Sequence, residues 1–289
     1  MINFLKLIRI HQWLKNLLIF LPLLLSLEPL DYEKFLSLFI SFFIFSAICS
    51  GNYIFNDLID YKDDISHPIN KKRPIASGNV GIVFAKSTCF ILFFFGFLFS
   101  FLFNLIFFYV CVLYLITAML YTYILKKIYF IDILVLALFY LFRIFICLAI
   151  LGAYYYSTWV ILFLFAFFLS LATLKRILEV KHRPNLSISN ARPYKFKDFN
   201  FLNSLYLILI ILTVLIFIFY GMRDEVDNIN IYMFGLSVSF LLFWCLYIYG
   251  KMVYFKVIKY DPFIFAITDY CSLLIGFLFL ISIYLSNIL

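Results

Sequence analysis

The chain has 289 residues, of which 66% are apolar, 22% are aromatic and only 13% are charged. Soluble domains are about half apolar and about a quarter charged, so this composition excludes a soluble globular protein and indicates a polytopic membrane protein. The net charge of +8 at pH 7 has to be explained by where the basic residues lie along the chain.

The chain begins with an amphipathic stretch at residues 1–16, MINFLKLIRIHQWLKN, which carries Lys6, Arg9 and Lys15. This pattern predicts a helix that lies at the membrane interface, with Trp13 at the level of the lipid headgroups. Long apolar runs follow, and one membrane span needs about 20 apolar residues. We predict nine transmembrane helices, at residues 16–30, 33–57, 81–101, 104–124, 129–152, 157–177, 202–220, 231–250 and 263–286.

Between these predicted spans no linker is long enough to hold a soluble domain. We therefore expect residues 1–289 to form a single all-α, membrane-embedded domain. The six cysteines lie within apolar segments and none forms a Cys-x-x-Cys pair, which predicts apolar packing and not zinc binding or disulfides. The histidines, His11, His67 and His182, lie far apart in polar segments, so no His/Cys metal cluster is predicted.

Basic residues gather in the segments that would share one side of the membrane. They are Lys6, Arg9 and Lys15; Lys62, Lys71, Lys72 and Arg73; Lys126 and Lys127; Lys175, Arg176, Lys181, Arg183, Arg192, Lys195 and Lys197; and Lys251, Lys256 and Lys259. The opposite segments hold only Lys34 and Arg223, each among acidic residues. Because positive loops stay in the cytoplasm, we predict a cytoplasmic N-terminus and an outside C-terminus. The net charge is therefore partly topological and does not indicate a nucleic-acid partner.

Residues 56–78, NDLIDYKDDISHPINKKRPIASG, form a polar window between long apolar runs. Asp57, Asp60 and Asp64 are spaced three and four apart, next to Asn56, at the cytoplasmic end of the second predicted helix. This spacing places the three carboxylates on one helical face, where like charges repel unless a cation lies among them. Oxygen ligands without His or Cys suit Mg²⁺ that is shared with substrate phosphates. The alternative is a solvated helix end with acids there by chance.

The second half of the polar window is basic. Lys71, Lys72 and Arg73 lie between Pro68 and Pro74, and the prolines end any helix and stiffen the loop. Lysine and arginine held there can bind the phosphate oxygens that a metal leaves free. Acids for a metal and bases for phosphate within one loop predict a site that handles a diphosphate. Topology alone would explain the basic residues but not the acids.

Four blocks of this chain resemble UbiA-type intramembrane prenyltransferases. The polar window carries N-D-x-x-D-x-x-x-D, which resembles their first aspartate-rich motif, and as a whole it is similar to NDxxDxxxDxxHPxKxxRPIASG of the decaprenyl-phosphate phosphoribosyltransferase branch. LKRILEV resembles that branch's KRxxE, and DPFIFAITDY resembles its DPxxFAxxD. IRIHQWLKNLLIFLP resembles RPxQWxKNxxxFxP; the matching residues are Arg9, Gln12, Trp13, Lys15, Asn16 and Pro22.

The chain also departs from the branch pattern. Asn70 stands where relatives usually carry lysine, and Ile10 replaces the proline after Arg9. An Arg…Tyr element of the branch is matched by Arg192 and Tyr194, or else the loop at 183–200 is remodelled.

The resemblance implies a Mg²⁺-dependent transfer of 5-phosphoribosyl from phosphoribosyl diphosphate to a membrane polyprenyl phosphate, of decaprenyl type, for cell-envelope glycan precursors. It implies a site that faces the cytoplasm in the cell membrane, with membrane lipids around the protein. Asp57, Asp60 and Asp64 become the metal-binding and catalytic residues. The candidate substrate-binding residues are Arg9, Lys15, Asn16, Asn56, Lys71, Lys72, Arg73, Arg143, Lys175, Arg176 and Arg192.

Two further features bear on the reaction. The segment at 175–200 is strongly basic, with only Glu179 and Asp198 as acids, so it suits phosphate better than a second metal. Arg143 lies in the middle of the fifth predicted span and should face the bundle interior, either as a structural partner or as a ligand for a substrate anion.

Two other functions stay open. A UbiA-type enzyme could move a polyprenyl group from its diphosphate to an aromatic acceptor, although such enzymes usually carry a second aspartate-rich motif, which the segment at 175–200 lacks. A polyprenyl-phosphate transporter would need charges along a central path, whereas Arg143 is almost the only charge in the middle of a predicted span. The sequence gives no indication of the oligomeric state.

Overall fold

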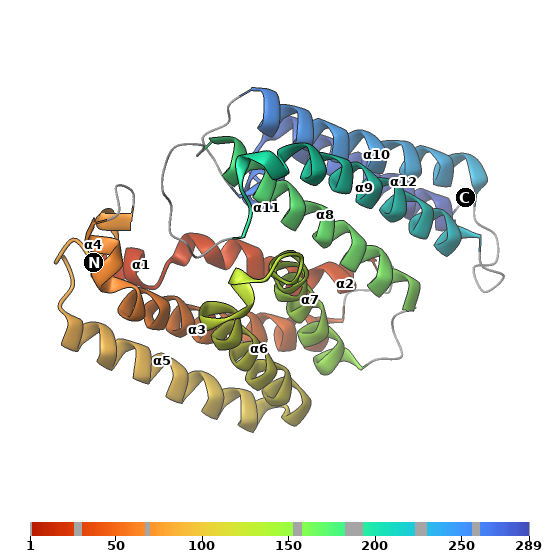
Figure 1. Ribbon diagram of the computed structural model, residues 1–289. Coiled ribbons are helices and arrows are strands. Elements are labelled where there is room, and N and C mark those ends of the chain that lie inside the picture. Colours follow the sequence, from red (N-terminus) through yellow and green to blue (C-terminus); the bar gives the residue numbers. More distant parts are fainter. Residues whose placement is uncertain are drawn as a thin grey trace. The chain divides into compact units, whose positions relative to one another are not determined.

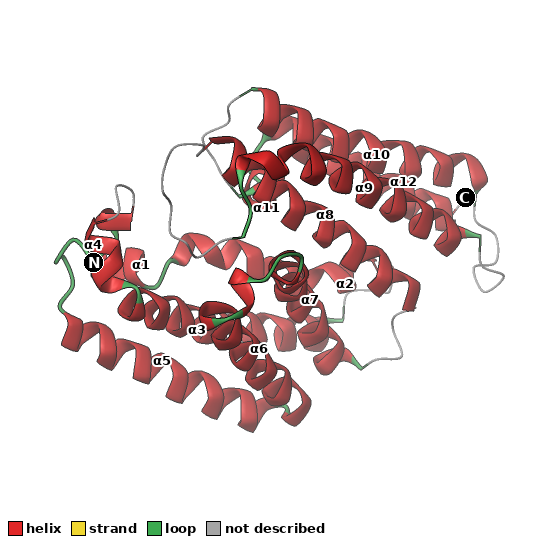
Figure 2. Ribbon diagram, viewed as in Figure 1, coloured by secondary structure: helices red, strands yellow, loops and turns green. Residues whose placement is uncertain are grey.

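The computed structural model describes residues 2–25, 31–66, 70–152, 158–182, 193–222, 230–255 and 261–288. Within these ranges every regular element is a helix and no strand occurs (Figure 2). The predicted all-α class is therefore confirmed.

Seven of the described helices are long and apolar enough to cross a membrane. They are α3 (Tyr32–Ile59), α5 (Ile82–Phe103), α6 (Leu105–Tyr123), α7 (Ile131–Leu151), α8 (Thr158–His182), α9 (Phe199–Gly221) and α10 (Ile231–Tyr254). With this content of apolar helices the chain is a multi-pass membrane protein.

The first and last predicted spans take a different form from the other seven. In the described part of the predicted span at 16–30, a 3₁₀-helix, η1 (Ile10–Phe20), continues into the short α2 (Leu21–Leu25). The predicted span at 263–286 is divided into α11 (Pro262–Ala266) and α12 (Tyr270–Ile288). The count of nine spans and the sides on which the termini lie stay predictions.

The chain divides into two compact units. The N-terminal unit comprises residues 1–24, 28–123 and 142–155, and the C-terminal unit comprises residues 25–27, 124–141 and 156–289. Helix α7 therefore contributes its first half to the C-terminal unit and its second half to the N-terminal unit.

In the N-terminal unit, α3 is the central helix and packs against α5, α6 and η1 (Figure 1). A glycine permits the close approach of α3 and α5: a Cβ atom at Gly96 would lie 2.6 Å from Cγ1 of Ile48. Small residues play this role in many membrane helix pairs. The buried side chains of Phe45, Ile54 and Phe107 complete this core.

In the C-terminal unit, α8 packs against α9, and α10 packs against α9 and α12. The buried Tyr206 joins two of these helices, because its hydroxyl donates to the carbonyl oxygen of Cys245 at 3.0 Å and its ring stacks on Tyr249. The hydroxyl thus has the partner that a buried polar group needs. Helix α11 contacts both α8 and α10.

The predicted single helix over residues 1–16 is wrong in form. Helix α1 (Ile2–Leu7) ends before Arg9, whose φ of 50° lies in the left-handed region that residues other than glycine rarely adopt. After this turn η1 packs on α3, where the indole nitrogen of Trp13 donates to Ser50 Oγ at 3.0 Å. An amphipathic pattern cannot foresee such a turn, because the segment gains its contacts from a helix later in the chain.

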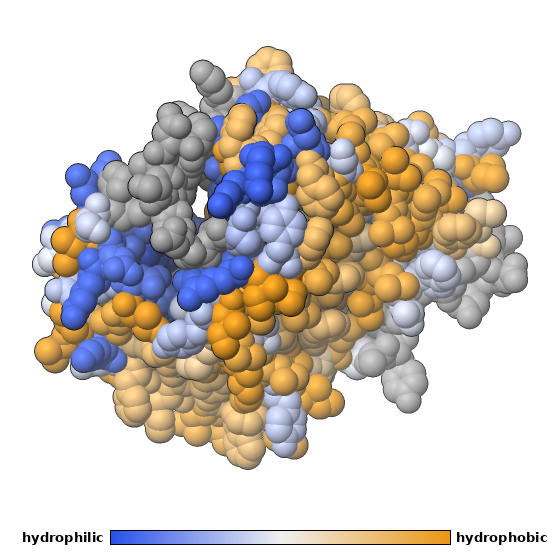
Figure 3. All heavy atoms as spheres, viewed as in Figure 1, coloured by the Kyte–Doolittle hydropathy of each residue, from blue (hydrophilic) through white to orange (hydrophobic). Residues whose placement is uncertain are grey.

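Polar and apolar side chains are sorted on the surface. In the view of Figure 3, hydrophilic residues gather around the end of α3 and over α4 (Tyr61–Ser66), whereas the surface over α5 and α6 is hydrophobic. The polar window thus lies at one end of α3, next to an apolar surface that suits a lipid environment.

Candidate functional site

The polar window is built where α3 passes into α4. Helix α3 ends at Ile59, Asp60 caps it, and α4 begins at Tyr61. Two backbone bonds of helical type cross this break, from Asp60 N to Asn56 O and from Asp64 N to Asp60 O, each 2.9 Å long. The predicted helical spacing of the acids therefore continues through a local interruption of the helix.

Arg73 brings two of the acids together. Its Nη1 lies 3.1 Å from Asp57 Oδ1 and 2.6 Å from Asp64 Oδ2. Because a single nitrogen contacts both oxygens, the two carboxylates converge on one point. Both carboxylates are buried, so their charges need this compensation.

Arg9 reaches the same place from the N-terminal segment. Its Nη2 donates to Asp57 Oδ1 at 2.5 Å, and its guanidinium carbon lies 5.0 Å from the centre of the Tyr53 ring. The first resembling block and the polar window therefore meet in one site. Asn70, one of the departures from the branch pattern, also belongs to the site, because its amide donates to Asp64 Oδ1 at 2.8 Å.

One oxygen of this cluster is unpaired. Asp57 Oδ2 is buried and has no hydrogen-bond partner among the described residues. A buried carboxylate oxygen in this state is costly, so the geometry favours a ligand that supplies positive charge there.

The residues fit a magnesium ion that is shared with a phosphate ligand. In the described part of the chain, no group of three or more His, Cys, Asp or Glu side chains is close enough to hold a metal. Mg²⁺ does not require such a cage, because it keeps several waters and is usually held by one or two carboxylates together with substrate phosphates. Asp57 and Asp64 provide those two carboxylates.

Other predicted residues surround this centre. Asn56 accepts a hydrogen bond from Thr122 Oγ1 at 3.0 Å, which links α3 to α6. Asp60 is partly exposed, and Lys71 and Lys72 are exposed on η2 (Asn70–Lys72). Lys15 is buried in η1.

The field around η1 is positive. Burial, and next the charges of Arg9 and Lys15, hold the pKa of His11 below its ordinary value. His11 is therefore neutral near pH 7, and the cations beside it favour an anionic ligand.

Arg143 lies deeper in the N-terminal unit. It is 4% exposed, which confirms that it faces the interior. Its Nε donates to Asn16 Oδ1 at 3.1 Å, and its guanidinium lies 5.3 and 5.8 Å from the ring centres of Phe45 and Tyr114. Asn16 in turn donates to Ser46 Oγ at 2.9 Å. Through these contacts Arg143 and Asn16 join α7, η1 and α3, and their predicted roles in substrate binding stay predictions.

The C-terminal unit holds a second charged cluster. Arg176 makes a bidentate pair with Asp132, with Nε–Oδ2 at 2.5 Å and Nη2–Oδ1 at 2.9 Å, and its Nη1 also contacts Glu179. Asp132 and Arg176 are almost fully buried, at 0% and 1% exposed. Asp132 lies in the first turn of α7. Its partner is signalled by a general rule, because a buried charge in an apolar chain needs an opposite one.

Three more predicted positions belong to this part of the chain. Lys175 Nζ lies 4.0 Å from Oδ2 of Asp261, which caps α11. Tyr194 accepts a hydrogen bond from the backbone N–H of Phe130 at 3.1 Å, and burial, followed by the Asp132 charge, raises the pKa of its hydroxyl. Arg192 lies outside the described residues.

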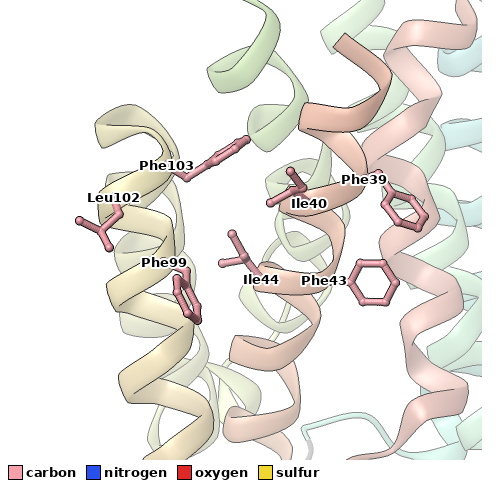
Figure 4. Close-up of a pocket in the computed structure, with 7 residues that line it drawn as sticks. All are labelled: Phe39, Ile40, Phe43, Ile44, Phe99, Leu102 and Phe103. Carbon is pink, nitrogen blue, oxygen red and sulfur yellow. The ribbon is translucent and has the colours of Figure 1, made fainter. Parts of the chain in front are cut away.

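An apolar groove lies between the first half of α3 and the last turns of α5 (Figure 4). Its volume is about 430 Å³, and its lining residues are Phe39, Ile40, Phe43 and Ile44 from α3 and Phe99, Leu102 and Phe103 from α5. With no polar side chain in its lining, the groove offers contacts to hydrocarbon alone.

Comparison with known proteins gives a family match over most of the chain. A model of the UbiA prenyltransferase family matches residues 17–262. An uncharacterised protein of Sinorhizobium fredii is 33% identical over 172 residues, which are 60% of this chain and 33% of that protein. The nodulation protein NoeC of Azorhizobium caulinodans is 36% identical over 84 residues, 29% of this chain and 27% of NoeC.

The decaprenyl-phosphate phosphoribosyltransferase of Mycobacterium tuberculosis is 39% identical over 79 residues, 26% of either chain. Each of these matches therefore covers about a third of the relative's length or less.

Solved structures share the fold along the whole chain. A UbiA homolog from Archaeoglobus fulgidus, bound to GPP and Mg²⁺, has a TM-score of 0.70 at 15% identity and covers 99% of this chain and 100% of its own. The structure of a digeranylgeranylglyceryl phosphate synthase has a TM-score of 0.64 at 16% identity and covers 99% of this chain and 98% of its own. At such identities the likeness concerns the fold.

Proposed function

This chain belongs to the UbiA prenyltransferase family, and on that premise we propose that it is a Mg²⁺-dependent polyprenyl-phosphate phosphoribosyltransferase. The donor is 5-phosphoribosyl diphosphate, and the acceptor is a membrane polyprenyl phosphate of decaprenyl type. The products are polyprenyl-phosphoryl-5-phosphoribose, a precursor for cell-envelope glycans, and diphosphate. The site faces the cytoplasm at the cell membrane.

The observation that carries this proposal is the meeting of two aspartates with two arginines at the end of α3. Asp57 and Asp64 converge, and Arg9 and Arg73 lie within hydrogen-bond distance of them. Carboxylates for a metal and guanidinium groups for phosphate oxygens are what a diphosphate donor requires. The similarity of part of the chain to a decaprenyl-phosphate phosphoribosyltransferase supports the choice of donor.

The chemistry needs little more from the protein than charge and position. The bond between ribose C1 and diphosphate breaks, and its electron pair leaves with the diphosphate. An oxygen of the polyprenyl phosphate forms the new bond to C1. Bound Mg²⁺ supplies charge neutralisation at the departing diphosphate. Arg9 and Arg73 stabilise the same growing charge through their guanidinium N–H donors.

No general base is required for this transfer. A phosphate monoester has a second pKa of about 6, so the acceptor oxygen is already largely ionised at pH 7. The acceptor therefore has no proton to lose in the transition state.

The donor's 5-phosphate needs its own cations. In the N-terminal unit the candidates that the sequence offers for this phosphate are Lys15, Lys71 and Lys72. Lys175 and Arg192 stay candidates from the sequence. We assign Arg176 to structure and not to the donor, because its guanidinium is held by Asp132 and Glu179.

A donor assay tests the proposal. Full-length protein in detergent is incubated with radiolabelled phosphoribosyl diphosphate and decaprenyl phosphate, with Mg²⁺ or with EDTA. We expect a labelled lipid product that EDTA abolishes and added Mg²⁺ restores. A parallel reaction contains geranylgeranyl diphosphate and an aromatic acceptor.

The alternative function is prenyl transfer to an aromatic acceptor, which the shared fold with a UbiA homolog bound to GPP and Mg²⁺ supports. Product from the prenyl donor alone would establish that alternative and refute ours. Movement of intact polyprenyl phosphate across a vesicle membrane, with no product from either donor, would indicate the transporter.

A further inference from the structure

We propose that Arg9 and Arg73 supply, beside Asp57 and Asp64, the positive charge that a bound metal would otherwise supply. Without ligand they neutralise Asp57 and Asp64, and when a metal and a diphosphate bind they move from the carboxylates to the phosphate oxygens. The inference rests on the proposed function only in placing a metal–diphosphate at these two aspartates, and it holds for a phosphoribosyl or a prenyl donor alike.

The first observation is that the arginines use atoms that a metal would need. Arg9 Nη2 and Arg73 Nη1 both contact the same oxygen, Asp57 Oδ1, at 2.5 and 3.1 Å. Arg73 Nη1 also contacts Asp64 Oδ2. A cation that bridges Asp57 Oδ1 and Asp64 Oδ2 would take the place of Arg73 Nη1, because this nitrogen already bridges those two oxygens.

The second observation is that the pairing is incomplete. Asp57 Oδ2 is buried and unpaired among the described residues, although two arginines reach its neighbouring oxygen. If these ion pairs served stability alone, both carboxylate oxygens of Asp57 should have partners, since a buried unpaired oxygen costs free energy. The open oxygen is therefore a position from which an incoming metal can bind before the arginines leave.

The third observation is the contrast in exposure between the partners. The side chain of Asp57 is 2% exposed, whereas those of Arg9 and Arg73 are 23% and 29% exposed. The carboxylate is held by the end of α3, while the long arginine side chains reach it from the surface and can turn to a new partner. A diphosphate that arrives beside the carboxylates offers them bidentate acceptors.

This exchange predicts how metal and anion affinities are coupled. Metal alone competes with the arginines and binds weakly. Diphosphate draws the arginines away, so metal binds more tightly in its presence, and by reciprocity the metal tightens the binding of diphosphate. If the arginines only contacted phosphate, their removal would leave the affinity for metal alone unchanged.

The test measures metal binding without any substrate. Mn²⁺ is titrated into full-length protein in detergent, and the electron paramagnetic resonance signal of the free ion reports binding. We expect Arg73→Ala and Arg9→Ala to bind Mn²⁺ about tenfold more tightly than the unaltered chain, because one charge-assisted competitor is gone. Both variants should lose affinity for Mg²⁺–diphosphate.

A matched control removes one positive charge from the same polar window. Lys62 is exposed on α4, so Lys62→Ala should change Mn²⁺ affinity less than twofold, by the weak attraction of exposed charges alone. Arg73→Lys serves if Arg73→Ala does not fold, since lysine keeps the charge but cannot bridge both carboxylates with the same geometry. It should bind Mn²⁺ more tightly than the unaltered chain, by a smaller factor.

Inorganic diphosphate provides the second measurement. In the unaltered chain it should increase Mn²⁺ affinity, and in Arg9→Ala and Arg73→Ala this increase should shrink. Unchanged or weaker Mn²⁺ binding in the folded arginine variants would overturn the proposal, as would a diphosphate effect equal in all proteins. These outcomes do not depend on which donor the donor assay identifies, so the two proposals can fail separately.

Discussion

The N-terminal unit and the C-terminal unit each contain ion pairs between arginine and aspartate. The pairing of the carboxylate oxygens is complete in the C-terminal unit and incomplete in the N-terminal unit. In the C-terminal unit Arg176 and Asp132 form a bidentate pair in which both partners are almost fully buried. In the N-terminal unit Arg9 and Arg73 are partly exposed and share one oxygen of Asp57, while the other oxygen has no partner among the described residues.

The difference separates ion pairs that hold a fold from ion pairs that can exchange partners. A closed, buried pair is strongly destabilising to break, because it leaves an uncompensated charge behind. A pair with an open oxygen and partly exposed cations has much less to lose and can accept a ligand. The same two residue types thus serve structure in one unit and, in our proposal, chemistry in the other.

The largest effect should come from breaking the closed pair. In Asp132→Asn the guanidinium of Arg176 loses its bidentate partner in a buried place, which should reduce the free energy of unfolding by about 3–5 kcal/mol. A thermal melt in detergent, with unfolding followed by the loss of helical signal, measures this.

A conservative change in the same cluster sharpens that result. Glu179 is 25% exposed where it meets Arg176, so Glu179→Gln should cost about 1 kcal/mol or less. Equal losses from both substitutions would contradict the view that burial of the Asp132 pair is what stabilises this unit.

The next effect concerns the open cluster. Asp57→Asn should lower the transfer rate by about 100- to 1,000-fold, the range seen when one charge-stabilising group is removed from an active site. Its thermal midpoint should stay within a few degrees of the unaltered value, because the pairing it breaks is incomplete. Initial rates with the radiolabelled donor, and a melt on the same preparation, provide the two readings.

Asp63 supplies the control for that substitution. It carries the same charge in the same window but is exposed, so Asp63→Asn should keep nearly full activity. An inactive Asp63→Asn beside an active Asp57→Asn would remove the catalytic assignment from this site.

The smallest effect should be one of affinity. Lys15→Ala should raise the Michaelis constant for phosphoribosyl diphosphate about tenfold, since one charge-assisted contact to the 5-phosphate is lost. Its dependence on Mg²⁺ should not change. Lys6→Ala, which removes an exposed charge from α1, is the matched control, and similar Michaelis constants in both variants would argue against a direct contact from Lys15.

Much of the helical architecture could be predicted from the sequence, because long apolar runs leave few alternatives in a membrane. The proximity of the acids to Arg73 could also be predicted, since these residues lie in one short stretch of sequence. The pairs of Arg9 with Asp57 and of Arg176 with Asp132 could not be predicted, although Arg9, Asp57 and Arg176 are each candidate site residues from the sequence. Partners separated by 48 and 44 residues meet only through helix packing, which local spacing does not encode.

The N-terminal turn was missed for a related reason. A positive φ is usually signalled by glycine or asparagine, and here an arginine adopts it. Arg9 contacts Asp57 of α3. Because this contact lies far away in the sequence, no residue preference near position 9 predicts the conformation.

The 3₁₀ form of η1 also determines how far this segment extends along α3. Arg9, Trp13 and Asn16 are anchored in turn to Asp57, Ser50 and Ser46. From Ser46 to Asp57 an α-helix rises about 16 Å. From Arg9 to Asn16 a 3₁₀ rise gives about 14 Å, whereas an α-helix would give only about 10 Å. The larger rise of the 3₁₀ form brings the length of the segment from Arg9 to Asn16 close to that of the segment from Ser46 to Asp57. The rise per residue of η1 therefore determines whether Arg9 can reach Asp57.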